Sequence, residues 1–455
     1  MPNKKIACLG GGSGYFARAL PDLAVTPGLA GSDVALYDID LEKCELMARH
    51  GQRLAEQAAT GQRVHACATL AEALDGADFA ITSIGGAGAS VGNVYGTGYH
   101  VQDILIPARY GIYQIVGDTG GPAGMMMALR SIPIYIDICH EMEKRCPRAI
   151  LFNHSNPMAV LCRAMLKYTG IQVVGVCHGV QIGLIKIGQI MNIDPREIDA
   201  LWVGTNHYHW FTRLYHQGKD IYPAVKERLA AFSKVQGEIM TNKLSQIYGY
   251  QIVYPEDDHA LEFYPFLTQL PDGEHLPYEQ KAWLPNGYTA DPAAQHEPSA
   301  TERAEARQQQ LSEMEERLGQ IELPAAMSDP ITGEGLGGLL QAIAQGRREV
   351  HIVNIPNQGA VPNLPAHAVL EIEAVTDSCG LRGIYMGEAP LVLAGLLQKR
   401  IVWQELVADA AVKGDRQLAL QALLMDEMAI VPEKAEAMLD ELLAASRPML
   451  PQFSA

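Results

Sequence analysis

Three features are missing from this chain of 455 residues: an excess of basic residues, paired cysteines and a long apolar run. Lys and Arg total 35 against 52 for Asp and Glu, so the formal net charge is −17 and neither a nucleic acid nor an anionic membrane is expected as a partner. The eight cysteines form no Cys-x-x-Cys pair, which indicates free thiols in a reducing cytoplasm. No apolar run is long enough for a signal peptide or a membrane-spanning helix, so we expect a cytoplasmic protein with a small diffusible substrate.

The first part of the chain alternates short apolar runs with helical stretches, a pattern typical of buried parallel strands joined by helices. Each run ends at Gly, Asp, Asn or Cys, and the runs are Ile6–Leu9, Val34–Ile39, Phe79–Ile84, Ala149–Phe152 and Val173–Val176. The sequence therefore predicts an α/β fold with a Rossmann-type, doubly wound parallel sheet. In such a sheet ligands bind at the carboxyl ends of the strands.

The pattern changes at about residue 195. We expect an NAD-binding domain over residues 1–195 and an α+β domain over residues 196–455, which would carry substrate, metal and oligomer contacts. Strands of this second region are expected at Glu349–Asn354 and Ala368–Val375, and helices over Ala389–Ala445. The charged stretch Asp291–Leu318 is predicted to be a solvated helix with a lead-in loop.

A glycine-rich turn follows the first predicted strand and contains Gly10, Gly12, Ser13 and Gly14. Such a turn lets backbone N–H groups approach a pyrophosphate at a helix N-terminus. Asp38 ends the second predicted strand, where a carboxylate can hold the adenine ribose hydroxyls and select NAD over NADP. The alternative is a purely structural turn beside an unrelated surface aspartate.

Two further polar segments end predicted strands and should face the same crevice. One is the glycine cluster of residues 85–88, from which Gly86 is a candidate cofactor contact. The other is Asn153-His154-Ser155-Asn156-Pro157, whose Asn153 and Asn156 amides could bind ribose or sugar hydroxyls. An Asn-Pro turn that merely stops the strand is the alternative.

A cysteine and a histidine complete the pattern of candidate ligands. Cys177-His178-Gly179-Val180 follows the fifth predicted strand, and Asn206-His207-Tyr208-His209 comes about thirty residues later. A thiolate and an imidazole at the end of a buried sheet could be two ligands of a divalent metal, with positions left open for substrate oxygens. Isolated cysteines and histidines are otherwise most often core residues.

Taken together, these motifs resemble the family 4 glycoside hydrolases over almost the whole chain. The matching segments are GGGS at 10–13, YDID at 37–40, IPARYGIYQIVGDTGGPAG at 106–124, ALRSIP at 128–133, NHSNP at 153–157, CHGV at 177–180, NHYHWF at 206–211, DDHALEFYPF at 257–266 and VNIPNQGAVPNLP at 353–365. The resemblance implies a fold related to lactate and malate dehydrogenases, with NAD and Mn²⁺ as cofactors.

The family's reaction differs from two-carboxylate glycoside hydrolysis, to which NAD-dependent glycosidases are exceptions. The resemblance implies that NAD oxidises the sugar at C3 and that a base removes the C2 proton. Elimination of the leaving group, addition of water at C1 and return of the hydride then restore the sugar. The Mn²⁺ ion would bridge sugar O2 and O3 and stabilise the charge that forms.

The resemblance also assigns roles to residues. Cys177 and His207 match the metal ligands, and His178 is the candidate general acid, with a spacer role as its alternative. The substrate-pocket positions fall on Arg130, Asn156 and Asn206, whereas Asn153 would contact the cofactor. The candidates for the C2 base are Asp257, Asp258 and Tyr264, although Asp258 stands where the family more often has arginine.

The motif Cys177-His178-Gly179 resembles the version that accompanies α-linked uronic acids. The resemblance therefore implies an unphosphorylated α-glycoside, with an α-glucuronide or α-galacturonide favoured over an α-galactoside or α-glucoside. A uronate carboxylate needs a cationic partner, for which Arg109, Arg130 and Arg213 are candidates. A net dehydrogenase of a sugar or hydroxy acid, and a regulatory protein that only senses NAD, remain as alternatives. Related enzymes imply a homodimer or homotetramer.

Overall fold

The computed structural model describes residues 4–85, 98–114, 116–231, 238–264, 299–331, 333, 335–426 and 430–453. Its strands are β1 (Lys5–Leu9), β2 (Asp33–Tyr37), β3 (Arg63–Ala66), β4 (Phe79–Thr82), β5 (Ile150–Asn153), β6 (Gln172–Gly175), β7 (Ile198–Thr205), β8 (Tyr208–His216), β9 (Lys219–Asp220), β10 (Val350–Pro356), β11 (Val369–Asp377) and β12 (Gly380–Gly383). Its helices are α1 (Phe16–Val25), α2 (Leu41–Gln57), α3 (Leu70–Leu74), α4 (Gly98–Arg109), α5 (Gly121–Arg145), α6 (Met158–Tyr168), α7 (Gly179–Met191), α8 (Tyr222–Ala231), α9 (Ile239–Tyr248), α10 (Asp257–Phe263), α11 (Ala300–Gly319), α12 (Leu336–Gln345), α13 (Leu391–Lys413), α14 (Arg416–Met425) and α15 (Pro432–Ala445).

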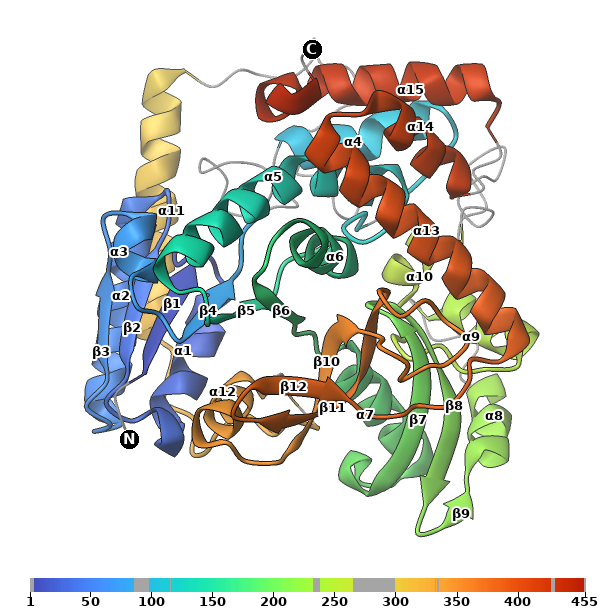
Figure 1. Ribbon diagram of the computed structural model, residues 1–455, viewed down its shortest axis with the longest axis horizontal. Coiled ribbons are helices and arrows are strands. Elements are labelled where there is room, and N and C mark those ends of the chain that lie inside the picture. The colour runs from blue at the N-terminus through green and yellow to red at the C-terminus, as the bar shows by residue number, and fades with distance from the viewer. Residues whose placement is uncertain are drawn as a thin grey trace.

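One mixed sheet carries the fold and runs across both halves of the chain (Figure 1). In the described residues it has nine strands, in the order β12-β11-β10-β6-β5-β4-β1-β2-β3. The strands β1 to β6 are parallel to one another, and five of these six were predicted as parallel strands from the sequence. The strands β10 to β12 are antiparallel and join the sheet where Asn354 of β10 pairs with Gly175 of β6. The predicted Rossmann-type α/β fold with a following α+β region is confirmed.

Burial explains which strands the sequence predicts and which it misses. In β1 the run from Ile6 to Leu9 is completely buried, because helices cover both faces of the parallel sheet. The strand β3 was not predicted, since it is short, lies at the sheet edge and buries only Val64 fully. The hairpin of β7 and β8 forms a separate sheet with β9. This hairpin was not predicted either, since its turn was interpreted only as a ligand motif.

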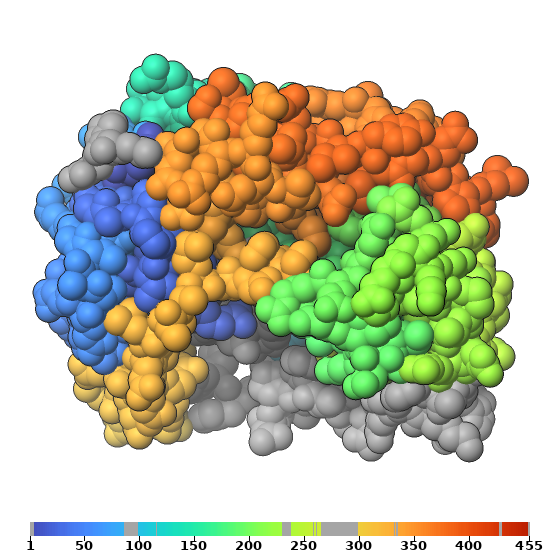
Figure 2. All heavy atoms as spheres, turned by 90° about the horizontal axis from the view of Figure 1, so that it is seen from below, coloured from blue at the N-terminus to red at the C-terminus, as the bar shows by residue number. Residues whose placement is uncertain are grey.

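The two halves of the chain are packed together rather than laid end to end. The helix α13 packs on both α5 and α6, and α12 packs on α1 (Figure 1). In Figure 2 the blue N-terminal residues and the orange residues between about 320 and 380 meet on one face. Segments from the second half therefore pack directly against the first half (Figure 2).

The charged stretch predicted as a solvated helix forms α11, and its residues 291–298 lie outside the described residues. A capping box of Ser299 and Glu302 starts this helix, and of its residues only Met314 and Leu318 are buried. Arg307 ties α11 to the first half through bonds to Asp40. Within the described part of the chain, no helix is long and apolar enough to cross a membrane.

Candidate active site

A cavity of about 910 Å³ opens at the carboxyl ends of the parallel strands. Its lining includes most of the predicted site residues, namely Gly10, Gly12, Ser13, Gly14, Asp38, Asn156, Cys177, His178 and His207. It also includes Asp118, Tyr254 and His259 from more distant segments. One cavity thus joins the glycine-rich turn to the predicted metal ligands.

The glycine-rich turn is shaped for the close approach of a dinucleotide. Gly10 has φ +77°, and a Cβ atom there would lie 2.1 Å from the Ser83 carbonyl oxygen, so only glycine fits. Asp38 accepts from the Gly12 N–H at 2.8 Å and from the Asp40 N–H at 2.9 Å. The carboxylate thus fixes the turn at the end of β2, where the ribose of a bound dinucleotide would lie. The residues at this end of the cavity fit NAD.

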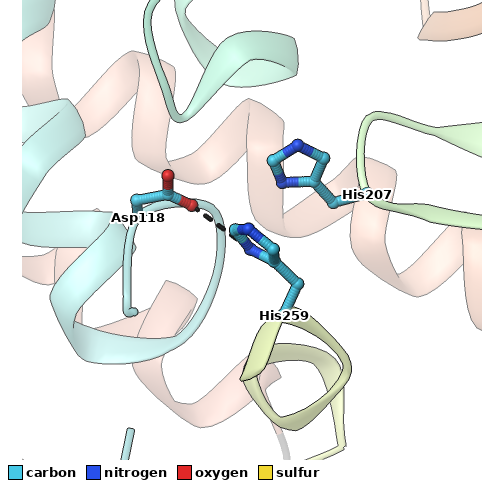
Figure 3. Close-up of side chains that lie close together, drawn as sticks. All are labelled: Asp118, His207 and His259. Atoms are coloured by element: carbon cyan, nitrogen blue, oxygen red, sulfur yellow. Dashed lines mark ion pairs between the residues drawn. The ribbon is translucent and has the colours of Figure 1, made fainter. Parts of the chain in front are cut away.

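Three side chains at the other end form a compact cluster of possible metal ligands (Figure 3). The candidate ligand atoms of Asp118, His207 and His259 lie within 4.8 Å of one another, and all three residues are buried. Nδ1 of His259 lies 3.6 Å from Oδ1 of Asp118. These side chains come from the loop before α5, from the β7–β8 turn and from α10.

The Cys177 thiol extends this cluster. Its Sγ atom lies 3.5 Å from Nε2 of His207, so the two predicted ligands are neighbours as expected. Imidazole and thiolate ligands suit transition metals, and a carboxylate suits Mn²⁺ and other hard divalent ions. The donor set of Cys177, His207, His259 and Asp118 therefore fits a divalent transition metal such as Mn²⁺.

The backbone presents His207 to the cavity from a tight turn. Asn206 and His207 form the two-residue connection between β7 and β8, and His207 has φ +60°, which is uncommon for a residue other than glycine. The pKa of His207 lies well below its ordinary value, mainly because the ring is buried and secondly because His259 is close. A neutral imidazole is the form that binds a metal.

Asn156 links the cluster to the substrate space. Its Nδ2 donates to Oδ2 of Asp118 at 2.8 Å. Its Oδ1 is buried, and no donor in the described residues reaches it, although Asn156 lines the cavity. A buried acceptor in this position is available to a sugar hydroxyl.

Five predicted site residues are not among the described residues that line the cavity: Arg130, Asn153, Asn206, Asp257 and Tyr264. The Arg130 guanidinium is buried and binds Asp103 and Ser446, so it packs inside the protein instead of facing a substrate. Asn153 is fully buried and accepts from the Tyr135 hydroxyl at 3.0 Å.

The remaining three residues, Asp257, Asn206 and Tyr264, are buried in the second half of the chain. Asp257 accepts from the Thr241 N–H and hydroxyl at 2.8 and 2.9 Å and so joins α10 to α9. Nδ2 of Asn206 donates to Oε2 of Glu371 at 3.4 Å, and Tyr264 is 2% exposed.

Other predicted positions are paired elsewhere or fall outside the description. The candidate carboxylate partners Arg109 and Arg213 form exposed ion pairs with Glu441 and Asp199. Gly86 lies outside the described residues, as does the side chain of Asp258.

Three residues of the site, Asp118, His259 and Tyr254, were not predicted individually from the sequence. Asp118 lies in the segment 106–124 and His259 in the segment 257–266, both of which carry the family resemblance. A carboxylate directly before a glycine-rich helix start and a histidine beside two aspartates were the available signals. Only the fold shows that these two segments are in contact.

Comparisons with known proteins match nearly the whole chain. A family model described as "Family 4 glycosyl hydrolase" matches residues 5–193, and one described as its C-terminal domain matches residues 202–429. An alpha-galactosidase of Bacillus subtilis (strain 168) is 28% identical, over 99% of this chain and 100% of its own length. An alpha-galacturonidase of the same strain is 31% identical, over 96% of each chain.

Solved structures agree with the observed fold. A 6-phospho-alpha-glucosidase from gut microorganisms, solved in complex with NAD and Mn²⁺, has a TM-score of 0.78 and 20% identity and covers 99% of each chain. A malate dehydrogenase of Cryptosporidium parvum has a TM-score of 0.52 and 11% identity, over 90% of this chain and 99% of its own. At these identities the likeness concerns the fold alone, and it includes the expected relation to malate dehydrogenases.

Proposed function

This chain belongs to the family 4 glycosyl hydrolases, and from that premise we propose that it cleaves unphosphorylated α-glycosides with NAD and Mn²⁺, preferably α-linked uronides. The bond would be broken by elimination after oxidation at sugar C3, and water addition and re-reduction would follow. One observation carries the proposal. The cavity that begins at Asp38 and the glycine-rich turn ends at the cluster of Asp118, Cys177, His207 and His259.

The residues present would hold both groups. Asp38, Gly10 and Gly12 would hold NAD, and the four clustered side chains would hold the metal. The chemistry that these groups supply is removal and return of a hydride at C3 and stabilisation of the negative charge that forms beside it. A related structure solved with NAD and Mn²⁺ supports this pair of cofactors.

Proton transfer falls to side chains in the cavity wall. His178 lines the cavity next to Cys177 at the start of α7, and we propose it as the acid that protonates the leaving oxygen. For the base, Tyr254 is better placed than Asp257 or Tyr264. Its ring lines the cavity with centroid distances of 5.1 Å to His207 and 4.8 Å to His259.

The uronide preference rests on Cys177-His178-Gly179 and on the relative named alpha-galacturonidase. Because Arg109, Arg130 and Arg213 form ion pairs elsewhere, we look for the partner of a sugar carboxylate among the cations in the described cavity lining, which are Arg18, Lys43 and Arg317. Arg18 is exposed at the cavity rim and is our candidate. An α-galactoside is the second candidate substrate, because a relative named alpha-galactosidase matches the chain over its full length.

The test is hydrolysis of p-nitrophenyl α-glycosides with and without NAD and Mn²⁺ under reducing conditions. The panel contains the galacturonide, glucuronide, galactoside, glucoside and 6-phosphoglucoside. We expect release only when both additions are present, fastest with a uronide, and without net NADH because the hydride returns to the sugar. Net NADH from free sugars or sugar acids, without nitrophenol release, would instead establish the dehydrogenase alternative.

Two cysteine variants test the metal assignment in the same assay. Cys177→Ala should abolish Mn²⁺-dependent release while leaving NAD binding intact, since the thiol lies at the metal end of the cavity. Cys379→Ala removes an exposed thiol and should behave as the unmodified protein does. Full activity of Cys177→Ala would remove this thiol from the metal site.

A further inference from the structure

Glu262 is a buried carboxylate directly behind the ligand cluster, with an exposed fraction of 2%. Its Oε2 accepts from the backbone N–H groups of Thr119 and Gly120, both at 2.7 Å. Its Oε1 lies 3.2 Å from Nδ1 of His259, one turn earlier on α10. This single side chain therefore contacts the loop that carries Asp118 and the helix that carries His259, two segments about 140 residues apart in sequence.

The three contacts to Glu262 define the state of His259. Two backbone N–H groups donate to Oε2, an arrangement that favours the ionised carboxylate, and a carboxylate can only accept. The Nδ1 atom of His259 then carries the hydrogen and donates to Glu262. Its Nε2 then carries no hydrogen, which is the form in which an imidazole nitrogen binds a metal.

Thr119 likewise determines which ring nitrogen of His207 carries the hydrogen. Its hydroxyl lies 2.5 Å from Oδ1 of Asp118 and 2.9 Å from Nδ1 of His207. A hydroxyl has one hydrogen, which goes to the carboxylate, so Nδ1 of His207 must donate to the hydroxyl oxygen. This leaves Nε2 of His207 as the acceptor atom facing the Cys177 thiol at 3.5 Å.

We propose that Glu262 and Thr119 are positioning residues of the metal site, which hold His259 and His207 in the tautomer that offers Nε2. They also fix the loop of Asp118, whose carboxylate lies beside the two rings (Figure 3). The inference deepens the proposed function and rests on it, because it concerns the residues behind the metal ligands. Partners of this kind orient ligating imidazoles and raise their basicity.

Glu262→Gln is the sharpest test, because it keeps the shape of the side chain and replaces one acceptor by a donor. The amide oxygen can still accept from Thr119 and Gly120. The amide nitrogen then faces Nδ1 of His259, which must accept, so the hydrogen moves to Nε2 and that ligand is lost. We expect Mn²⁺ affinity to fall roughly 10- to 100-fold.

A second pair of variants keeps the inference testable if Glu262→Gln does not fold. Thr119→Val removes the hydroxyl and keeps the branched shape, whereas Thr119→Ser keeps the hydroxyl. We expect weaker Mn²⁺ binding, by roughly tenfold or more, in Thr119→Val and recovery in Thr119→Ser. A purely structural role of the side chain would not give this rescue by a smaller residue.

The measurement is a titration of the full-length protein with Mn²⁺, with free ion followed by electron paramagnetic resonance. NAD affinity is measured in parallel and should not change, since neither residue is among the described residues that line the cavity. If the unmodified protein binds no Mn²⁺, the proposed function fails and this inference with it. If the unmodified protein binds Mn²⁺ and the folded Glu262→Gln or Thr119→Val variants bind it equally well, only this inference fails.

Discussion

Glu371 is a carboxylate buried inside the sheet, on β11 and opposite Asn354 of β10. Asn206 donates to its Oε2 at 3.4 Å, and no donor in the described residues reaches its Oε1. Burial raises the pKa of Glu371 to about 7, and the amides of Asn206 and Asn354 only partly oppose this shift. At neutral pH the folded protein therefore retains part of a proton that the unfolded chain has already lost.

This shift predicts a pH-dependent stability. The pKa of Glu371 is raised in the folded state, so the protonated carboxyl contributes to the free energy of unfolding. This contribution is fully present below the unfolded pKa of 4.5 and is lost as pH rises to about 7. Glu371→Gln cannot ionise, so it should be more stable than the unmodified protein above neutral pH, by up to about 3 kcal/mol. At about pH 4, below the unfolded value, the two should have similar free energies of unfolding.

Urea unfolding at about pH 4 and about pH 9 measures this difference. The exposed Glu388→Gln is the matched control and should show no pH-dependent gain. An equal difference between Glu371→Gln and the unmodified protein at both pH values would refute the prediction.

At the same scale, single residues show how far the sequence could identify the site. Cys177 and His207 follow recognisable strand and turn motifs, and the structure places their Sγ and Nε2 atoms 3.5 Å apart. His259 and Asp118 could not be paired from sequence, because their contact depends on α10 packing against the start of α5. Arg130 has the right charge for a substrate carboxylate, but only the structure shows that Asp103 neutralises it.

At the scale of elements, Gly120 just before α5 lies against the end of α10. A Cβ atom at this position would lie 2.9 Å from the Glu262 backbone oxygen and 3.4 Å from Nη1 of Arg400. The absence of a side chain is thus what allows the Asp118 loop to reach α10. Arg400 itself is buried and pairs with Asp426 at 2.7 Å, so it has little room to move.

Gly120→Ala should therefore force α5 and α10 apart. We expect a loss of about 1 to 3 kcal/mol in the free energy of unfolding and weaker Mn²⁺ binding, because the two helices position Asp118 and His259. Gly395→Ala is the control, since Gly395 is exposed in α13 and has no neighbouring atom within 4 Å. Helix propensity and chain entropy should make that variant more stable by roughly 0.5 to 1 kcal/mol. Equal stability of the two variants in urea would contradict this account.

Elements also differ in how well sequence predicts them. Continuous apolar runs identify β1, β4 and β5, whose residues are buried on both faces. The edge strand β3 gives no such signal, and the antiparallel addition of β10 to β6 depends on a contact between distant segments. Local periodicity carries no information about that pairing.

For the whole molecule, the shared sheet bears on how the chain unfolds. The family models divide the chain between residues 193 and 202, close to the predicted boundary at 195 and 196. Nevertheless β10, β11 and β12 extend the sheet of the first half, and α13 packs on α5 and α6. We therefore predict one cooperative unfolding transition. The homodimer or homotetramer stays a prediction that light scattering can test.

The tryptophans make this prediction easy to measure. All four, at positions 202, 210, 283 and 403, lie in the second half, so their fluorescence reports on that half alone. Far-ultraviolet circular dichroism reports on the whole chain. The two thermal transitions should coincide, and separate midpoints would show two independently unfolding domains.

In the proposed reaction the glycosidic bond breaks after oxidation at C3 and loss of the C2 proton. Hydrolysis of the best p-nitrophenyl α-glycoside in D₂O, with NAD and Mn²⁺ present, tests it most directly. Because the returning proton comes from solvent, we expect deuterium on C2 of the released sugar, detected by mass spectrometry and NMR. Hydrolysis that leaves only hydrogen on C2 would contradict it.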